Sequence, residues 1–484
     1  MKYRGGTGFE GGATLAPNLW RDNEQKGRPR RRRYRAKMQM ALILVALFAV
    51  VALVLGIVTT FQPKKESVGK EVTKGHGRVS IAATEQRERL ENADQRIAKD
   101  WKKSSVNPFL SPVPVIRQDG VDTYPVPSIA VLVVCYNRPA YLNRTLSAIF
   151  RYLPNSPKLD VIVSQTGMLQ DLNETEVTNV IHSFPVSQHF QKLDRKEPDI
   201  PPCPEDSPTP CEGPGTYYVA EHYRFALNKV FNELGYAAAI IIEDDLDLSP
   251  DFFEYFLATY PMLNEDKSLY CVSAYNDHGQ HFFVFRNETF IITHKQVLLP
   301  ATLYRSDFFP GLGWMLTQQL WQRELQHSWP DRYWDEWMRQ EEVRMGRHCI
   351  RPEISRSKTF GEEGINHGQF YLRYLRGVRL FNGFVRWRSL DLSYLYEDNF
   401  DYWMEKMAKE ALLIEDASHQ RLYTNTTLKR VWRDEEEFRV LANGYNLLPE
   451  FKNGIPRGSY KGLLPFRYLR NTILLIKHNS PFDI

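Results

Sequence analysis

Three consecutive carboxylates follow a short apolar run in the middle of the chain. Residues 237–242 read AAAIII, and Glu243, Asp244 and Asp245 come directly after them. A short, bounded apolar run is typical of a strand that is buried on both faces. Carboxylates crowded at the end of such a strand repel one another, so we expect a positive partner or a solvated cleft there. An acidic loop after a strand is the plainer alternative.

The position of these carboxylates favours a metal and phosphate site. In open α/β sheets the carboxyl ends of the strands face the ligand crevice. Adjacent Asp carboxylates there suit a hard cation such as Mg²⁺ or Mn²⁺ that also holds phosphate oxygens. The segment Ser249-Pro250-Asp251 predicts a helix start, with Ser249 as N-cap and Pro250 at the first helical position. A buried strand before the acids and a capped helix after them favour a ligand site over an acidic loop.

Alternating strands and helices must position this site. The predicted strands are residues 129–134, 159–164, 237–242 and 269–274, and the predicted helices are residues 139–152, 217–234 and 329–339. Gly235 ends the second of these helices. Strands and helices that alternate in this way predict an α/β fold with parallel strands and a site at their carboxyl ends.

The second half of the chain is rich in aromatic residues and glycine. In the helix predicted at 329–339, Trp334, Trp337 and Met338 share one apolar face. Residues 351–370 contain three glycines and are predicted to form a mobile loop. The aromatic part from residue 390 onward is predicted to form a smaller second unit.

The N-terminal part differs in composition from the rest of the chain. The 484 residues are 43% apolar and 13% aromatic, which is enough for a large core, and the net charge is +4. Eight Lys and Arg residues lie within residues 26–37, so the remainder is net negative. This excludes a nucleic-acid binder, which spreads basic residues over its folded body. Residues 38–61 are apolar, uncharged and long enough to span a bilayer, which favours an anchor over a cleaved signal peptide.

The charges beside the anchor predict its orientation. The basic block precedes it and only Lys64 and Lys65 follow closely, so the N-terminus is expected in the cytosol. Four Asn-X-Thr sequons agree with a lumenal location of the rest, at Asn143, Asn173, Asn287 and Asn425. The expected parts are a cytosolic tail (1–37), a transmembrane anchor (38–61), a lumenal stem (62–124), an α/β domain (125–370) and a connector with a small C-terminal domain (371–484).

Five cysteines are an odd number for a chain in an oxidising compartment. Cys203 and Cys211 flank a Pro-rich loop and are candidates to close a small ring. Cys271 and Cys349 are candidates to pair across the fold. Cys135 is then left over and is expected to be a buried thiol.

Seven segments taken together resemble the N-acetylglucosaminyltransferase I family. They read HYRFALNKVF, IIEDDLDLSPDFFEYF, LYCVSAYND, DFFPGLGWML, YWDEWMR, RPEISRSKTFG and HGQFY, in this order. The resemblance implies a GT-A-type, Rossmann-like nucleotide-sugar transferase domain in a single-pass type II protein of the Golgi membrane. It also implies transfer of N-acetylglucosamine from UDP-GlcNAc to the 2-hydroxyl of a mannose, with inversion and with Mn²⁺.

The resemblance further implies roles for single residues. Asp245 matches the carboxylate that binds the metal, while Glu243 and Asp244 match neighbours that touch the donor sugar and nucleotide. Asp335, the first acid of WDEW, matches the catalytic base. A solvated helix acid is the alternative for that residue. The other donor-binding positions are Arg138, Thr166, His222, Gly364, Ile365 and Asn366, of which the last three fall in a loop that closes over the donor.

Some positions depart from the family's pattern. Thr166 stands where members often carry an Asp that contacts the uracil, so the charge-assisted part of that contact is missing. Gly167 stands where some relatives have a partner for Cys135, and Asn366 replaces a Ser. A packing role in its helix is the alternative for His222. The predicted metal ligand and base are both kept, which argues against a membrane-anchored sugar-binding protein without catalysis.

The expected chemistry needs one metal site and one base. UDP leaves readily once a divalent cation neutralises its diphosphate, and inversion needs one carboxylate to take the proton from the attacking hydroxyl. A glycosidase needs two carboxylates that flank the bond, and a two-metal phosphoesterase needs more ligands; the sequence nominates neither set. The resemblance implies transfer to the α-1,3-linked mannose of an oligomannose N-glycan on glycoproteins. Transfer to O-linked mannose is the alternative, although residues 62–124 are too short and polar for the extra carbohydrate-binding domain common in such relatives.

Overall fold

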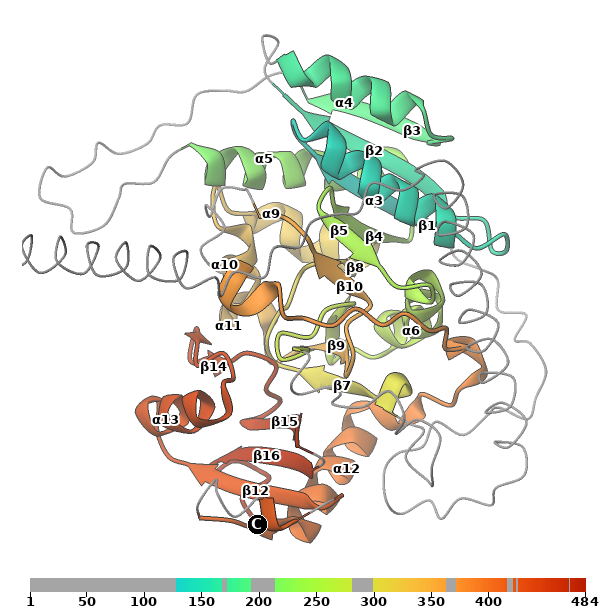
Figure 1. Ribbon diagram of the computed structural model, residues 1–484. Helices are drawn as coiled ribbons and strands as arrows, with labels where there is room; N and C mark the ends of the chain where they lie inside the picture. The colour runs from blue at the N-terminus through green and yellow to red at the C-terminus, as the bar shows by residue number, and fades with distance from the viewer. Residues whose placement is uncertain are drawn as a thin grey trace, which may run out of the picture. The chain divides into compact units, whose positions relative to one another are not determined.

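The centre of the fold is a mixed sheet of eight strands (Figure 1). Its strands are β1 (Ile129–Cys135), β2 (Asp160–Thr166), β3 (Gln188–Lys192), β4 (Ala238–Glu243), β6 (Leu269–Ser273), β7 (Leu303–Ser306), β8 (Trp314–Thr317) and β9 (His348–Pro352). In space the order is β3-β2-β1-β4-β8-β6-β9-β7. The first four of these run parallel, and β8 is antiparallel to both β4 and β6. The fold is therefore α/β with a mixed sheet.

The computed structural model describes most of the chain after residue 127. The described ranges are 128–167, 172–192, 214–280, 299–362, 371–415, 421–423, 425–469 and 471–484, and all of them belong to the compact unit 104–484. The predicted tail, anchor and stem, residues 1–124, lie outside these ranges. Among the described residues, no helix combines the length and the apolar character that crossing a membrane requires.

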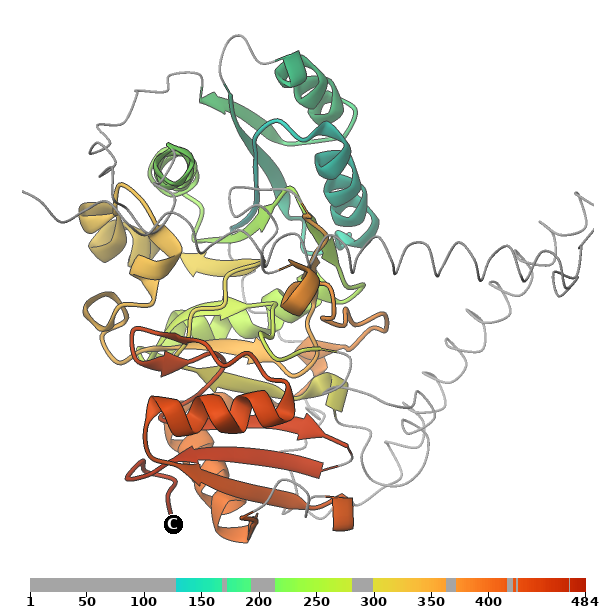
Figure 2. The ribbon, with the colours of Figure 1, turned by 60° about the vertical axis from the view of Figure 1, so that its left-hand side comes forward.

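The parallel half of the sheet follows the predicted strand-helix-strand pattern. Helix α3 (Pro139–Tyr152) joins β1 to β2 and has the bounds that the sequence predicts. Helix α4 (Leu172–His182) joins β2 to β3. Figure 2 shows α3 and α4 on one face of these strands and α5 (Gly215–Asn228) on the other. Both faces are covered, which explains why the strands read as continuous apolar runs.

The core fixes the elements around the site. Every residue of β1 is buried, and in β4 only Glu243 is partly exposed. A cluster of buried aromatic and aliphatic side chains joins β1 and β4 to α5 and to Trp314 and Trp334. Each large apolar side chain buried in this way contributes about 1.5–3 kcal/mol to stability. Side chains carried by these elements therefore have well-defined positions.

Two predicted helices have different bounds in the structure. The helix expected at 217–234 is α5 followed by one π-helical turn, η1 (Lys229–Glu233), and Gly235 then has a φ of 72°. The helix expected at 329–339 is only α10 (Trp334–Met338). Tyr333 has a φ of 50°, a left-handed conformation that cannot continue a right-handed helix, so the helix begins after it.

The predicted cap at Ser249 is wrong. Helix α6 (Phe252–Glu265) begins later and has Asp251 at its N-cap position. The hydroxyl of Ser249 donates to Asp251 Oδ1 at 2.7 Å instead of accepting from a helix N–H. Asp251 also accepts from the buried Arg356, whose Nε lies 3.2 Å from Oδ2, and from Trp387 Nε1 at 2.8 Å. The Asp251 carboxylate therefore pairs with the buried guanidinium and does not cap the N–H groups of the helix.

The segment predicted to be a mobile loop, 351–370, is partly regular. It contains the end of β9 and strand β10 (Ser357–Thr359), which pairs antiparallel with β5 (Leu246–Leu248) directly after the carboxylates. The prediction of a loop is wrong for these residues because their partner strand was not apparent from the sequence. Residues 363–370 lie outside the described ranges.

The C-terminal part forms a second sheet of four strands, ordered β11-β12-β16-β15. Its elements are α12 (Glu397–Glu410), β11 (Leu412–Leu413), β12 (Thr427–Trp432), α13 (Glu435–Tyr445), β15 (Leu463–Tyr468) and β16 (Asn471–Lys477), with a hairpin of β13 (Phe451–Lys452) and β14 (Ile455–Pro456) before β15. It has its own apolar core around Trp432 and Phe438. This is an α+β arrangement.

Short helical turns connect the larger elements. They are η3 (Leu299–Ala301), α8 (Gln318–Leu320), η4 (Trp321–Leu325), α9 (Gln326–Ser328), α11 (Glu341–Arg344), η5 (Tyr371–Leu375), η6 (Trp387–Ser389) and η7 (Ser393–Leu395).

Candidate active site

The carboxyl ends of β1, β2 and β4 bring together five of the predicted site residues. Strand β1 lies between β2 and β4, and all three run parallel. Glu243 ends β4, with Asp244 and Asp245 directly after it, Thr166 ends β2, and Arg138 precedes α3 just after β1. The sheet therefore brings these five residues to one edge, which is where ligands bind in α/β folds.

Arg138 is the positive partner that the three carboxylates require. Its Nη1 donates to Asp245 Oδ2 at 3.2 Å, and its Nη2 donates to Asp244 Oδ1. Helix α3 also holds the loop through Thr145, whose hydroxyl donates to the carbonyl oxygen of Asp244 at 2.8 Å. The charges of Asp244 and Asp245 raise the pKa of Arg138 although burial alone would lower it. The guanidinium therefore stays charged at the strand ends.

One guanidinium does not offset the whole negative charge. Burial raises the pKa of Glu243 to about 7, and the neighbouring charge of Asp245 adds to this effect. Burial likewise raises the pKa of Asp244 to about 6, in spite of Arg138. Burial also raises the pKa of Asp245. An additional cation at this place would be bound favourably.

The residues at this edge fit a divalent cation that substrate oxygens complete. Oδ1 of Asp245 and Oδ2 of Asp244 are buried and have no hydrogen-bond partner. Among the described residues, no group of three or more His, Cys, Asp or Glu side chains could hold a metal by itself. Mg²⁺ and similar ions are commonly bound by one or two carboxylates together with substrate phosphates and water. An unpartnered oxygen of Asp245 suits such a site.

Gly361 lies against the Asp245 carboxylate. The N–H of Phe360 donates to the carbonyl oxygen of Asp245 at 2.9 Å, which continues the pairing of β10 with β5. A Cβ atom at the next residue, Gly361, would overlap Oδ2 of Asp245. Sequence analysis missed this contact because it depends on the pairing of two three-residue strands.

Tyr223 connects the acids to α10. Its hydroxyl donates to Glu243 Oε1 at 2.6 Å, and its ring stacks on Trp334 with the centroids 4.2 Å apart. Burial is the main cause that raises the pKa of Tyr223. The charge of Glu243 and its hydrogen bond raise it further, and the charges of Asp245 and Asp335 act in the same direction. Tyr223 therefore links the end of β4 to the helix that carries Asp335. The helical spacing of Tyr223 marks it as a core residue, and no sequence signal indicated this second role.

Asp335 is an accessible carboxylate on a fixed helix. Its side chain is 43% exposed, and its Oδ2 accepts from Arg339 Nη1 at 2.9 Å. The preceding Trp334 is buried and stacks on Trp314, the first residue of β8, with the centroids 5.6 Å apart. Because β8 pairs with β4, this packing keeps Asp335 near the strand end that carries the other acids. The Arg339 contact has helical i,i+4 spacing, so the sequence contained a signal for it.

His222 and Thr166 lie at the same end of the sheet but have protein partners. Nε2 of the buried His222 lies 2.9 Å from the hydroxyl oxygen of Ser164 in β2. The hydroxyl of Thr166 donates to the carbonyl oxygen of Lys192 at 3.4 Å. Their donor-binding roles remain predictions. Gly364, Ile365 and Asn366 lie outside the described residues, and so do Cys203 and Cys211.

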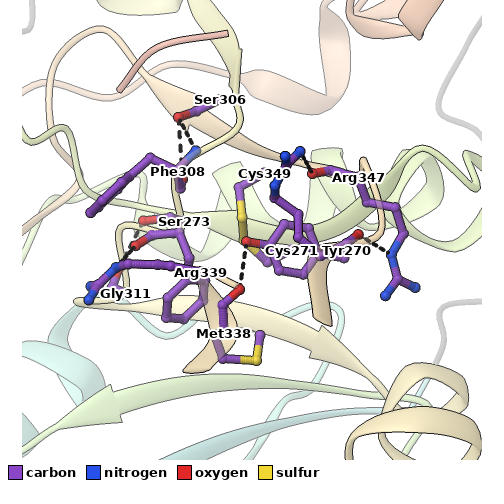
Figure 3. The surroundings of a disulfide bond; sticks show 12 residues. Tyr270, Cys271, Ser273, Ser306, Phe308, Gly311, Met338, Arg339, Arg347 and Cys349 are labelled. Carbon is purple, nitrogen blue, oxygen red and sulfur yellow. Dashed lines mark hydrogen bonds between the residues drawn. A yellow bond between two sulfur atoms is a disulfide. The ribbon is translucent and has the colours of Figure 1, made fainter. Parts of the chain in front are cut away.

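Cys271 and Cys349 occupy paired positions of β6 and β9, with the Cα atoms 4.6 Å apart and the sulfurs bonded (Figure 3). The hydroxyl of the adjacent Tyr270 donates to the carbonyl oxygen of Met338 at 3.4 Å, at the end of α10. The cross-link therefore lies in the strands that support the helix of Asp335. Cys135 is a buried free thiol, and burial raises its pKa.

Comparison with known proteins identifies the class that this fold and site represent. The chain is a glycosyltransferase that belongs to the GNT-I family, whose sequence model matches residues 36–483. A relative from Arabidopsis thaliana is 35% identical over 347 residues, which cover 71% of this chain and 72% of the relative. That relative is named alpha-1,3-mannosyl-glycoprotein 2-beta-N-acetylglucosaminyltransferase. The predicted family is confirmed.

Solved structures show weaker similarity. A mannosyltransferase from Pyrobaculum calidifontis, solved with GDP-Man and Mn²⁺, is 16% identical with a TM-score of 0.30, covering 57% of this chain and 66% of that one. Glucosyl-3-phosphoglycerate synthase from Mycobacterium tuberculosis, solved with Mn²⁺, UDP-glucose and glycerol 3-phosphate, is 13% identical with a TM-score of 0.22, covering 40% of this chain and 58% of that one. Scores this low support no conclusion about this chain.

Proposed function

We propose that this chain is an inverting, Mn²⁺-dependent glycosyltransferase of GT-A fold that moves N-acetylglucosamine from UDP-GlcNAc to the 2-hydroxyl of a mannose. The observation that carries the proposal is the group of carboxylates at the end of β4, beside Arg138 and linked through Tyr223 and Trp334 to the helix of Asp335. Asp245, with an oxygen that has no partner, suits a metal, and Asp335, partly exposed on α10, suits a base. The name of the Arabidopsis relative supports the α-1,3-linked mannose of an N-glycan as acceptor.

The strand ends bind the donor in this proposal. Asp245 would hold Mn²⁺, which neutralises the charge that develops on the departing diphosphate. Glu243 and Asp244 present their carboxylates at the same edge, beside Arg138. We infer that these groups contact the sugar and nucleotide and orient the anomeric carbon. Leaving-group departure then needs no protein acid.

Asp335 supplies the proton acceptor. The 2-hydroxyl of the mannose attacks the anomeric carbon of N-acetylglucosamine from the face opposite to UDP. As the new C–O bond forms, the C–O bond to UDP breaks and its electron pair leaves with the diphosphate. The hydroxyl proton passes to a carboxylate oxygen of Asp335. One displacement inverts the anomeric centre, so a β linkage forms from an α-linked donor.

The location of the enzyme is also a proposal. We infer a single-pass type II protein of the Golgi membrane, with residues 38–61 in the bilayer and the catalytic domain in the lumen. The basic residues before this segment support that orientation. The polar residues 62–124 would act as a stem between bilayer and enzyme.

Transfer assays with matched donors and acceptors test the proposal. The purified chain is incubated with Mn²⁺ and with UDP-GlcNAc, UDP-GalNAc or GDP-mannose, and an oligomannose N-glycan or an O-mannosyl peptide serves as acceptor. We expect one added N-acetylglucosamine on the oligomannose glycan from UDP-GlcNAc by mass spectrometry, and a β-1,2 linkage by NMR. Transfer to the O-mannosyl peptide alone would show that the acceptor is O-linked mannose and not the N-glycan. Tight UDP binding without transfer to either acceptor would indicate a sugar-binding protein.

A further inference from the structure

A shared, buried cation directly follows the helix that carries Asp335. Arg339 Nη1 donates to Asp335 Oδ2 at 2.9 Å and lies 3.2 Å from Glu336 Oε1. Its Nε donates to the carbonyl oxygen of Phe309 at 3.1 Å, and its guanidinium lies 4.7 Å from the ring centroid of Phe308. The side chain is only 6% exposed, so the guanidinium has little freedom to move. Two neighbouring carboxylates therefore compete for one fixed nitrogen.

Glu336 has a second cation, which comes from the C-terminal part. Lys452 Nζ lies 2.8 Å from the same Oε1 of Glu336. The next residue, Asn453, donates its Nδ2 to the carbonyl oxygen of Glu336 at 3.3 Å. Both belong to the β13–β14 hairpin, far from α10 in the sequence. The hairpin thus contacts both the side chain and the backbone of the residue that follows Asp335.

The hairpin is itself attached to the large sheet. Arg457, just after β14, donates its Nε to Glu450 at 2.6 Å and its Nη1 to Asp277 at 2.7 Å. Glu450 in turn lies 3.3 Å from Lys452. The guanidinium of Arg457 also lies over Phe308, the ring that Arg339 contacts. The position of Lys452 is therefore fixed relative to α10.

We propose that Lys452 is a positioning residue of the transfer reaction, because by neutralising Glu336 it leaves Arg339 available to hold and stabilise the Asp335 carboxylate. The small C-terminal part of the chain then contributes to the charge environment of the base. This inference rests on the proposed role of Asp335 as base.

The charged groups around Asp335 give the direction of the effect. Glu336 lies on the same helix, and Arg339 directly follows it. Tyr223 of α5 stacks on the neighbouring Trp334 and donates to Glu243, while Lys452 of the hairpin contacts Glu336 and lies beside Glu450. An opposite charge nearby favours the ionised carboxylate, and a like charge disfavours it. Removing the cation at 452 therefore makes Asp335 easier to protonate, and removing the anion at 336 makes it harder.

The pH dependence of kcat/KM for the mannose acceptor, measured on the full chain at saturating donor, tests the proposal. We expect Lys452→Met to move the midpoint of the acidic limb to higher pH by about 0.4 unit, a loss of about 2.5-fold in kcat/KM on that limb. We expect Glu336→Gln to move the midpoint to lower pH by a similar amount. The double variant should behave like Glu336→Gln alone, because Lys452 acts through Glu336.

A matched control removes another lysine of the C-terminal part. Lys409 pairs with Glu405 on its own helix, α12, and Lys409→Met should leave the acidic limb unchanged. The proposal would be overturned if the acidic limb of the pH profile stayed in place in both Lys452→Met and Glu336→Gln. It would also be overturned if the limb moved in the same direction in both variants. Additive shifts in the double variant would also overturn it, since the lysine would then act on Asp335 directly.

A second readout separates this proposal from the proposed function. The carboxyl carbon signal of Asp335 in ¹³C-aspartate-labelled protein is assigned by its loss in Asp335→Asn and titrated without substrates. The same opposite shifts in Lys452→Met and Glu336→Gln are expected even if no transfer is observed. If the Asp335 signal shifts as expected in both variants but no transfer occurs, the proposed function is rejected and the positioning role stands. If transfer is normal but the signal does not shift, the positioning role of Lys452 is rejected and the proposed function stands.

Discussion

Asp245 and Asp335 have opposite surroundings, and these surroundings match opposite tasks. Asp245 is crowded with two other carboxylates and keeps a buried oxygen without a partner. Asp335 is 43% exposed and contacts one guanidinium. A metal ligand gains from a site where negative charge is poorly compensated, whereas a base must reach its substrate. The acids that end a buried strand indicate a metal site at Asp244 and Asp245 by themselves, whereas Asp335 is predicted only through family resemblance, because a carboxylate's solvation is not visible in its neighbours along the chain.

At the residue scale, Gly361 should be required for metal binding. A methyl group there would overlap Oδ2 of Asp245, so Gly361→Ala must displace either the carboxylate or the backbone after β10. We expect at least about a tenfold weaker affinity for Mn²⁺ in the presence of UDP, measured by calorimetry, which corresponds to about 1.4 kcal/mol. Gly444→Ala in α13 is the control, because nothing lies within 4 Å of a Cβ there. Equal affinity in Gly361→Ala and the parent would contradict the contact.

The pH dependence of stability follows from the same carboxylates. Burial raises the pKa of Glu243 to about 7 and that of Asp244 to about 6, above their values in the unfolded chain. A raised carboxyl pKa stabilises the folded state at low pH, and this contribution is lost as pH rises from about 4 to about 7. Without metal, we therefore expect a lower Tm at pH 7.5 than at pH 5.5 by scanning fluorimetry.

Metal should reverse this loss. Mn²⁺ should raise Tm more at pH 7.5 than at pH 5.5, because the carboxylates must be ionised to bind it. Asp245→Asn should abolish most of the increase while making the metal-free protein less sensitive to pH. An equal increase in Asp245→Asn and the parent would place the metal elsewhere.

At the element scale, the sequence predicts the parallel half of the sheet well. The strands β1 and β4 and helix α3 follow from apolar runs and from a proline in the first helical turn, which are local signals. The errors arise where distant residues decide. The carboxylate of Asp251 pairs with the distant Arg356, and β10 pairs with β5 within a segment that was predicted to be a loop. The left-handed Tyr333 shortens α10, and no local pattern predicts that conformation.

The cross-link between β6 and β9 should stabilise the elements under α10. Cys271 and Cys349 are 78 residues apart in the sequence and both are fully buried. We expect denatured, unreduced protein to yield a linked peptide pair containing both residues by mass spectrometry. Replacing both by Ala and Val should lower the free energy of unfolding by about 2–5 kcal/mol. Cys135→Ala is the control and should leave the linked pair intact; two alkylated cysteines at 271 and 349 would contradict the pairing.

At the scale of the whole molecule, the C-terminal part completes the fold around the large sheet. The N–H of Asp307 donates to the carbonyl oxygen of Ser459 at 2.7 Å, and Asp307 Oδ2 accepts from the N–H of Lys461 at 2.7 Å. Nε2 of His278 lies 2.8 Å from the carbonyl oxygen of Arg457. The sequence predicts a separate small unit here, but it does not show that polar groups of the sheet depend on it.

A chain that ends at residue 396 should therefore fail to fold stably. Each buried polar group that loses its partner costs about 1–3 kcal/mol, and domains have only about 5–15 kcal/mol of stability. We expect the truncated chain to be insoluble or to lack a cooperative thermal transition by circular dichroism. The full-length variant Asn453→Ala is the control. It loses one exposed hydrogen bond and should retain a cooperative thermal transition. A truncated chain that unfolds cooperatively near the parent's Tm would contradict this dependence.

The most direct test of the two-carboxylate site measures transfer and UDP binding in the same preparation of Asp335→Asn. Asparagine keeps the shape of the side chain but cannot accept the proton from the mannose hydroxyl. We expect single-turnover transfer from UDP-GlcNAc to fall by about 10²–10⁴. Mn²⁺-dependent UDP affinity should stay within about threefold of the parent, because the donor site is built on β4 and Asp245. Transfer at the parent's rate, or loss of UDP binding together with transfer, would contradict Asp335 as the base.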